Sequence, residues 1–159
     1  MTTNPAAKTG YCNGSDMLLY VGDKPVGHCT THTLTLISET KERQVKPVAT
    51  APITKALFKG KGVTGLSYTI SSEGLVFYGE TESGYKDLFK AWKTGESITA
   101  KCMERGDSAQ PYLVGKCVIT SLERTDPAND DSTYSVTLDN DGAPDTLDES
   151  AITETTPAA

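Results

Sequence analysis

Metal ligation is the first chemistry that the residue types allow. His28 and Cys29 are adjacent, and Cys12 and His32 are near them in the sequence. Adjacent side chains on a strand point to opposite faces, so His28 and Cys29 would not share a metal ion. The chain also lacks the C-x-x-C pair that commonly supplies two zinc ligands. The spacing therefore predicts no metal site.

Nucleotide binding and hydrolysis are the second possibility. Gly60, Gly62 and Gly65 match G-x-G-x-x-G. A dinucleotide site needs a strand before this pattern and a helix after it, because the phosphates bind at the helix N-terminus. Here a basic segment precedes the pattern and a predicted strand, residues 66–70, follows it. No serine lies in a G-x-S-x-G motif. We therefore predict no catalytic residue, no cofactor and no enzymatic activity.

Two cysteines offer redox chemistry. Cys102 and Cys117 are equidistant from the centre of a predicted turn at residues 105–110, so they could be cross-strand neighbours. The N-terminus has no apolar segment of the secretory kind, which favours a reducing cytoplasm and free thiols. A reduced apolar pair is therefore the preferred interpretation, and a disulfide is the alternative.

Charge is distributed unevenly along the 159 residues. The net charge is −6 overall, with +4 in residues 1–61, −1 in residues 62–125 and −9 in residues 126–159. An acidic balance opposes binding to duplex DNA, which depends on neutralising phosphates. The apolar runs are too short for a transmembrane helix, so we expect no membrane insertion.

A long basic loop is predicted at about residues 39–63. Pro47 and Pro52 oppose a long helix or a central strand there. A loop of this length in a compact domain is usually functional. Its basic residues are Lys41, Arg43, Lys46, Lys55, Lys59 and Lys61.

The rest of the chain is predicted to be mainly β, because Thr and Ser alternate with apolar residues. We expect turns at residues 22–25 and 72–74. The predicted strands are residues 17–21, a strand from residue 26, and residues 32–38, 66–70, 75–78, 98–103, 112–122 and 134–138.

One helix is predicted at about residues 84–93, with Ser83 as N-cap and Gly95 at its end. Four apolar residues recur at the spacing of one helical face, which we expect to pack on the core. They are Tyr85, Leu88, Phe89 and Trp92.

The chain end is acidic and has no apolar periodicity. We predict one domain over residues 1–143, in which residues 1–15 form a flexible arm. An acidic, disordered tail is predicted over residues 144–159.

The order of the segments is informative beyond their individual patterns. An opening hairpin is followed by a Thr/Ser-rich strand, a long loop, a strand, the helix and three further strands. The segments are residues 16–21, 25–30, 32–38, 65–71, 85–92, 96–103, 112–122 and 133–138. In this order they resemble the phage tail tube, or major tail, protein family over about residues 16–143.

The resemblance implies a β-sandwich or barrel-like domain flanked by the helix. It implies rings, of six subunits, that stack into the tail tube of a virion assembled in the host bacterial cytoplasm. Genome DNA and a tape-measure protein would pass through the lumen, and a tail terminator and baseplate or tip proteins would be further partners.

The resemblance also implies that the long loop contacts the adjacent ring, which makes its six basic residues the expected ring–ring contact. The alternative that the residues leave open is a monomeric β-sandwich that acts as a binding or adhesion module.

Overall fold

The computed structural model describes residues 10–46, 58–79, 81–105 and 110–148. A short 3-10 turn, Gly14–Asp16, precedes the first strand, and helix α1 (Tyr85–Thr94) separates β4 from β5. The strands are β1 (Met17–Val21), β2 (Lys24–Pro25), β3 (Cys29–Arg43), β4 (Gly60–Leu75), β5 (Ile98–Glu104), β6 (Leu113–Thr125), β7 (Thr133–Asn140) and β8 (Thr146–Leu147). The predicted mainly β fold with one flanking helix is confirmed.

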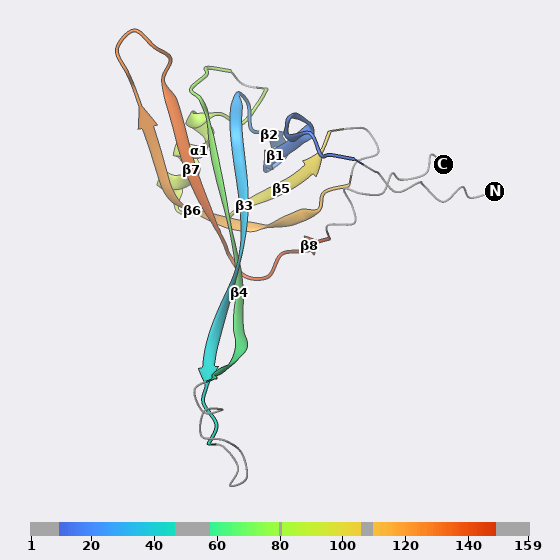
Figure 1. Cartoon of the computed structure of the whole chain (residues 1–159). Helices are drawn as coiled ribbons and strands as arrows, with labels where there is room; N and C mark the ends of the chain where they lie inside the picture. The colour runs from blue at the N-terminus through green and yellow to red at the C-terminus, as the bar shows by residue number, and fades with distance from the viewer. Residues whose placement is uncertain (1–9, 47–57, 80, 106–109, 149–159) are drawn as a thin grey trace, which may run out of the picture.

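The strands form one antiparallel sheet in the order β2-β1-β5-β6-β7-β4-β3, and β8 pairs with β6 (Figure 1). The long strand β6 belongs to both halves of this sheet. Its first part, to Cys117, pairs with β5, and its second part, from Cys117 to Thr125, pairs with β7. A register shift between Ile119 and Ser121 marks the transition. Among the described strands the sheet does not close into a barrel.

The core forms where the two halves of the sheet face each other. Leu19, Cys102 and Leu113 from one half join Ile70 and Leu138 from the other in a single buried cluster. This arrangement is compatible with the sandwich-like fold that was expected.

Gly115 lets the two halves approach closely. A Cβ atom at this position would collide with the hydroxyl of Tyr68, which lies on β4 in the other half of the sheet. Glycine is therefore required here for packing rather than for a turn.

Helix α1 begins and ends one residue later than predicted, and Gly95 follows its last residue as expected. Gly84, not Ser83, is the N-cap, and its N–H donates to Oδ2 of Asp87 at 3.3 Å. Ser83 is buried and its hydroxyl donates instead to the carbonyl of Val21 at 3.3 Å, which removes it from capping. Gly95 ends the helix with a φ of 70°, the left-handed conformation predicted for it.

The predicted turn at residues 72–74 is wrong, because β4 continues through it to Leu75. Gly74 serves close packing here: a Cβ would lie 2.6 Å from the carbonyl oxygen of His28 and 2.9 Å from the hydroxyl of Tyr134. Residues 76–78, expected to be part of a strand, are outside the sheet. Val26 makes only an isolated bridge with Ser83.

The long loop was also predicted too wide. Its two ends are strand, since Lys41 pairs with Gly62 and Arg43 with Gly60. The missing apolar alternation misled the prediction, because these strand ends leave the core and need no buried face. Pro47, Pro52 and Lys55 lie outside the described residues.

Two residues of the predicted acidic tail, 144–159, are strand in the described chain. Thr146 and Leu147 form β8 and pair with Val114 and Leu113 of β6. Most of the predicted tail (residues 149–159) and most of the predicted N-terminal segment (residues 1–9) lie outside the described residues. No helix in the described ranges is long and apolar enough to span a bilayer.

Candidate assembly surfaces

The four strands β3, β4, β7 and β6 present two chemically distinct faces. Alternation along each strand puts the buried residues, such as Ile70, Val136 and Leu138, on one face, which we call the core face. The opposite face is dominated by Ser and Thr, and we call it the hydroxyl face. It consists of Thr31, Thr33, Thr35, Ile37, Ser67, Thr69, Ser71, Glu73, Leu75, Val118, Ser121, Glu123, Thr125, Thr133, Ser135, Thr137 and Asp139, of which three are apolar.

The strand register aligns these hydroxyls in rows across the sheet. Thr33 is opposite Ser71, Ser71 is opposite Thr137, and Thr137 is opposite Ser121. The side chains of one row meet directly, since Thr69 donates to Oδ1 of Asp139 at 2.8 Å. None of the residues of the hydroxyl face is buried. The described chain therefore leaves this face open to solvent.

The hydroxyl face carries negative charge alone. Its charged members are Glu73, Glu123 and Asp139, and none of these rows holds lysine or arginine. Such a face offers acceptors and neutral donors but no cation to bind a phosphate. The same alternation continues to Lys41 and Arg43 in the arm of β3 and to Lys116 at the start of β6.

This four-stranded unit has two free edges in the described part of the chain. Strand β3 pairs only with β4, so one side of its 15 residues has no partner strand. Strand β6 pairs with β5 only as far as Cys117. On the side that faces β5, residues 118–125 of β6 therefore have no partner strand among the described residues. At the opposite end of the sheet from β3 lies β2. It has only two residues, one of them Pro25, and both features oppose pairing with another strand.

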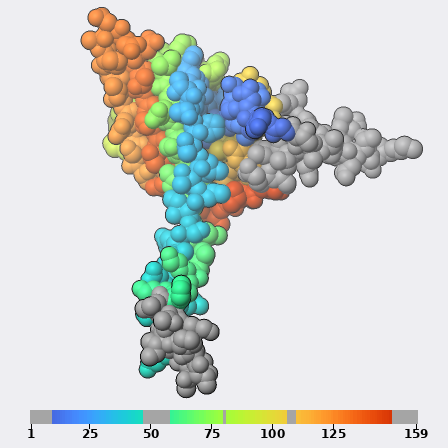
Figure 2. Space-filling model, in the orientation of Figure 1, coloured from blue at the N-terminus to red at the C-terminus, as the bar shows by residue number. Residues whose placement is uncertain are grey.

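The β3–β4 hairpin extends beyond the body as an arm, residues 38–43 and 60–66 (Figures 1 and 2). Five of the six basic residues predicted to contact the next ring are described, and they gather at its end. They are Lys41, Arg43, Lys46, Lys59 and Lys61, all exposed. Lys59 pairs with Oε2 of Glu42 at 3.2 Å. Whether these residues contact a neighbouring ring stays a prediction.

The opposite end of the same strands is acidic. The β6–β7 turn, residues 126–132, contains Asp126, Asp130 and Asp131. Arg124 donates to Oδ1 of Asp126 at 2.9 Å. A hydrogen bond from Ser132, together with this one from Arg124, holds the pKa of Asp126 below its usual value. Figure 1 shows this turn and the arm at opposite ends of the molecule. The unit is therefore basic at one end and acidic at the other.

The predicted helix face is only partly buried. Leu88 is fully buried, and Tyr85 is half-buried with its ring 6.4 Å from that of Tyr134. Phe89 and Trp92 are 44% and 52% exposed, so their predicted packing on the core is wrong for the single chain. In the single chain the core therefore covers Leu88 and part of Tyr85, but not the other two side chains.

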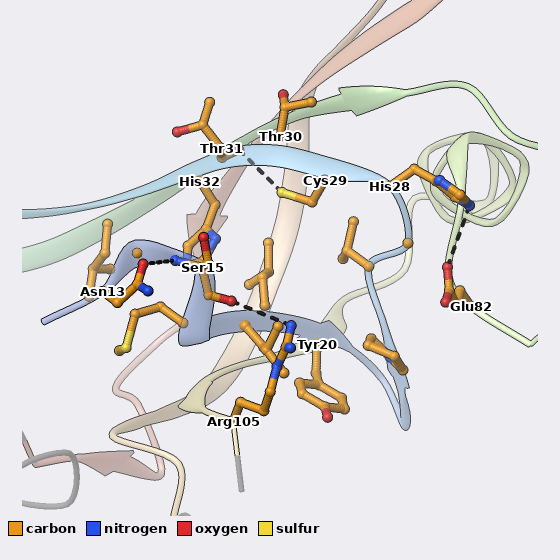
Figure 3. Close-up of a pocket in the computed structure, with 18 of the residues that line it drawn as sticks. Asn13, Ser15, Tyr20, His28, Cys29, Thr30, Thr31, His32, Glu82 and Arg105 are labelled. Carbon is orange, nitrogen blue, oxygen red and sulfur yellow. Dashed lines mark hydrogen bonds and ion pairs between the residues drawn. The ribbon is translucent and has the colours of Figure 1, made fainter.

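The candidate metal ligands do not converge. Figure 3 shows a groove between β1 and the start of β3, with the His28 side chain directed away from Cys29 and towards Glu82. His28 lies against the ring of Phe77 and 3.9 Å from Oε2 of Glu82. The described residues contain no group of three His, Cys, Asp or Glu side chains placed to hold a metal ion.

Cys102 and Cys117 are free thiols and are not cross-strand neighbours. Cys102 is opposite Leu113, and Cys117 is opposite Ile98, so the predicted register between β5 and β6 is wrong. Both are buried, and burial raises the pKa of Cys102 to about 11. Such thiols are structural rather than reactive.

The hydroxyl face and the free edge of β6 were missed from the sequence. The alternation that marks the hydroxyl face was visible within each strand, as in Thr31, Thr33 and Thr35. Its rows were not visible, because they depend on the register between strands that are distant in the sequence.

Comparison with known proteins gives one consistent result. A family model described as phage tail tube protein matches residues 11–146. Among curated protein sequences there is no significant match.

Solved structures share the fold. The tail of an empty gene transfer agent particle, refined with C6 symmetry, matches at a TM-score of 0.65 and 16% identity, covering 86% of this chain and 99% of that one. The SPP1 tail tube matches at 0.57 and 15%, covering 82% and 76%. A sheath/tube terminator of an extracellular contractile injection system matches at 0.58 and 18%, covering 86% and 96%. The chain belongs to the phage tail tube protein family, as the family model shows over most of its length.

Proposed function

We propose that copies of this structural tail tube protein join through their sheet edges into rings of six, and that the rings stack into a conduit for genome DNA. The observation that carries the proposal is the four-stranded unit β3-β4-β7-β6 with a free edge on each side. The C6 symmetry of the gene transfer agent tail supports the number six.

Strand direction favours pairing between the two free edges. Neighbouring strands in the unit are antiparallel, so β3 and β6, the first and last of four, run in opposite directions. When β3 of one copy meets β6 of the next, the junction is antiparallel like every other pair in the sheet. Closure of the ring then leaves no edge of this unit unpaired, which removes the driving force for random aggregation.

The hydroxyl face would line the lumen. Helix α1 and the β1-β5 half of the sheet pack on the core face, so this bulky side lies outside the closed barrel. The uncovered hydroxyl face is then the inner wall. Its Ser and Thr side chains and its three carboxylates would not attract phosphates, so DNA slides along the wall without being held.

Stacking would join the basic arm of one ring to the acidic β6–β7 turn of the next. The two lie at opposite ends of the same strands, which suits a head-to-tail stack. Exposed charges contribute little affinity per pair, but complementary ends fix the register and direction of the stack.

The proposal extends to the partners and the place of assembly. Structures that share this fold include a sheath/tube terminator of a contractile injection system and the baseplate of the anti-feeding prophage. We propose a tail terminator, baseplate or tip proteins and a tape-measure protein as partners. Assembly would take place in the host cytoplasm, and the role is structural, without catalysis.

Sedimentation velocity and negative-stain electron microscopy of the purified chain over a range of concentrations test the proposal. The expected result is a concentration-dependent change from monomers to rings and tubes of uniform bore. A monomer at every concentration and salt would overturn the proposal and favour a monomeric binding module.

A further inference from the structure

We propose that Phe89 and Trp92 of one copy pack on Leu36 and Leu66 of the neighbouring copy in the same ring. This contact rests on the edge pairing proposed above and adds an apolar contact to it. Phe89 and Trp92 are called the helix patch, and Leu36 and Leu66 the strand patch.

The helix patch continues an aromatic row from the core to the surface. The ring of Tyr85 lies 6.4 Å from buried Tyr134 and 6.2 Å from Phe89, and Phe89 lies 6.2 Å from Trp92. The row thus ends in two large rings that the single chain leaves about half exposed. Aromatic side chains of this kind are the residues that most often anchor protein interfaces.

The helix patch lies beside the free edge of β6. Helix α1 packs along this strand, and the Arg124 guanidinium sits over the Tyr85 ring, 5.2 Å from its centre. The helix ends at Gly95, close in sequence to Ile98, which pairs with Cys117 at the point where the free edge begins. Figure 1 shows α1 next to β6 and β7. A strand added at this edge would therefore lie next to the helix.

The strand patch lies at the other edge of the unit, with Leu36 on the edge strand β3 and Leu66 on its neighbour β4, and both residues are on the core face. Leu36 and Leu66 continue the core-face alternation of Leu34 and Tyr68, but they are 62% and 78% exposed. Their own chain does not cover them, because they lie where the hairpin leaves the body. A core-face stripe that continues past its own core indicates a surface that another molecule covers.

The geometry points to a second copy as that molecule. Edge pairing makes the core faces of two copies continuous, so β3 of one copy enters next to α1 of the other. The strand pairing puts Leu36 level with the end of the helix. Leu36 is opposite Tyr68, and the N–H of Tyr68 donates to Oδ1 of Asn140. Asn140 is opposite Cys117, which in turn pairs with Ile98, just after the helix. Both patches are apolar, and each would cover the other.

Trp92 is the single tryptophan of the chain, so its fluorescence reports this contact directly. The experiment measures emission and iodide quenching of the wild-type protein, and sedimentation velocity assigns each sample to monomer or ring. We expect ring formation to shift the emission to shorter wavelength and to remove most of the iodide quenching. Rings whose Trp92 is quenched as in the monomer would overturn the contact and leave edge pairing intact. A chain that never assembles would overturn both.

Two matched variants test the strand patch. Leu36→Ser removes an apolar side chain from it, and should raise the concentration needed for rings by about tenfold or more, as expected for exposing one buried leucine. Leu147→Ser makes the same change at a leucine of β8 that is 52% exposed and belongs to neither patch. It should leave that concentration unchanged.

Thermal unfolding of both variants verifies that they fold. Equal effects of the two substitutions on ring formation would overturn the contact. If Leu36→Ser fails to fold, the quenching of Trp92 in the wild-type protein still decides the question.

Discussion

Reversing the charge of the arm should block stacking and spare the rings. The variant is Lys41→Glu, Arg43→Glu and Lys46→Glu. In the wild-type protein, residues 39–46 and 58–61 carry five basic and two acidic side chains, a net charge of +3. The triple variant carries two basic and five acidic side chains there, a net charge of −3. All three positions are exposed, so the fold should not change.

The magnitude follows from the exposure of these charges. An exposed ion pair contributes about 0.2–1 kcal/mol, so losing three pairs costs roughly 1–3 kcal/mol per subunit. Repulsion between the reversed arm and an acidic β6–β7 turn adds a cost of similar size. A ring of six presents six arms at once, and independent contributions add. The lost pairs alone amount to roughly 6–18 kcal/mol per ring–ring interface, which is enough to abolish stacking.

Electron microscopy and sedimentation velocity at low salt provide the assay. The expected result is single rings in place of tubes. The matched control substitutes glutamate for Lys86, Lys101 and Lys116. It changes the total charge by the same amount, but these three residues lie on the body of the molecule rather than on the arm. Control tubes should form normally, and circular dichroism should show both variants folded.

Two results would refute the reasoning about the arm. Tubes of normal length from the triple variant would show that the arm is not the stacking contact. Loss of tubes in the control to the same extent would show that total charge, rather than the arm, decides assembly.

Three other predictions concern packing, titration and the lumen. Gly115→Ala should destabilise the fold by about 1–3 kcal/mol in urea unfolding, because the added methyl group collides with the Tyr68 hydroxyl. Gly14→Ala is the control and should be nearly neutral, since nothing lies within 4 Å of the added methyl group. Equal effects of the two substitutions would contradict the close packing at Gly115. The free energy of unfolding should fall between pH 9 and 11, because the pKa of Cys102 rises from 9.0 to about 11 on folding. The thiol of the unfolded chain then ionises first, which costs up to roughly 3 kcal/mol by pH 11; urea unfolding that is unchanged between pH 8.5 and 11 would argue against it. Ser71→Lys should make assembled tubes retain labelled DNA in a salt-sensitive way, whereas wild-type tubes do not, and variant tubes that retain none would place the hydroxyl face elsewhere.

The parts of the fold that depend on local sequence were predictable. The spacing of Tyr85, Leu88 and Trp92 defined the helix, and Gly95 defined its end, because both signals act within one or two turns of chain. The strands around Leu19 and Val136 followed from alternation in the same way. Even so, the spacing did not predict that Phe89 and Trp92 would stay exposed, which depends on the width of the surface that receives the helix.

The errors arose where one local sequence pattern is compatible with more than one structure. Gly74 was interpreted as a turn, but it allows His28 and Tyr134 to approach β4. The polar stretches on either side of the arm were interpreted as loop because alternation disappears where a strand leaves the core. The register between Cys102 and Cys117 was wrong, because equal spacing from a turn assumes a symmetric connection.

The candidate site was the least predictable part. Five of the six basic residues gather at the end of the arm because they are close in sequence, and their contact with a neighbouring ring stays a prediction. The hydroxyl face and the two free edges arise only when strands from four parts of the chain are placed side by side, and no local pattern contains that information.

A cryo-electron microscopy reconstruction of tubes grown from the purified chain tests the central claim most directly. We predict a closed wall in which β3 of each copy pairs antiparallel with residues 118–125 of β6 in the next, with Ser71 and Thr137 facing the bore. A tube in which either strand edge is unpaired, or in which helix α1 faces the bore, would contradict the account.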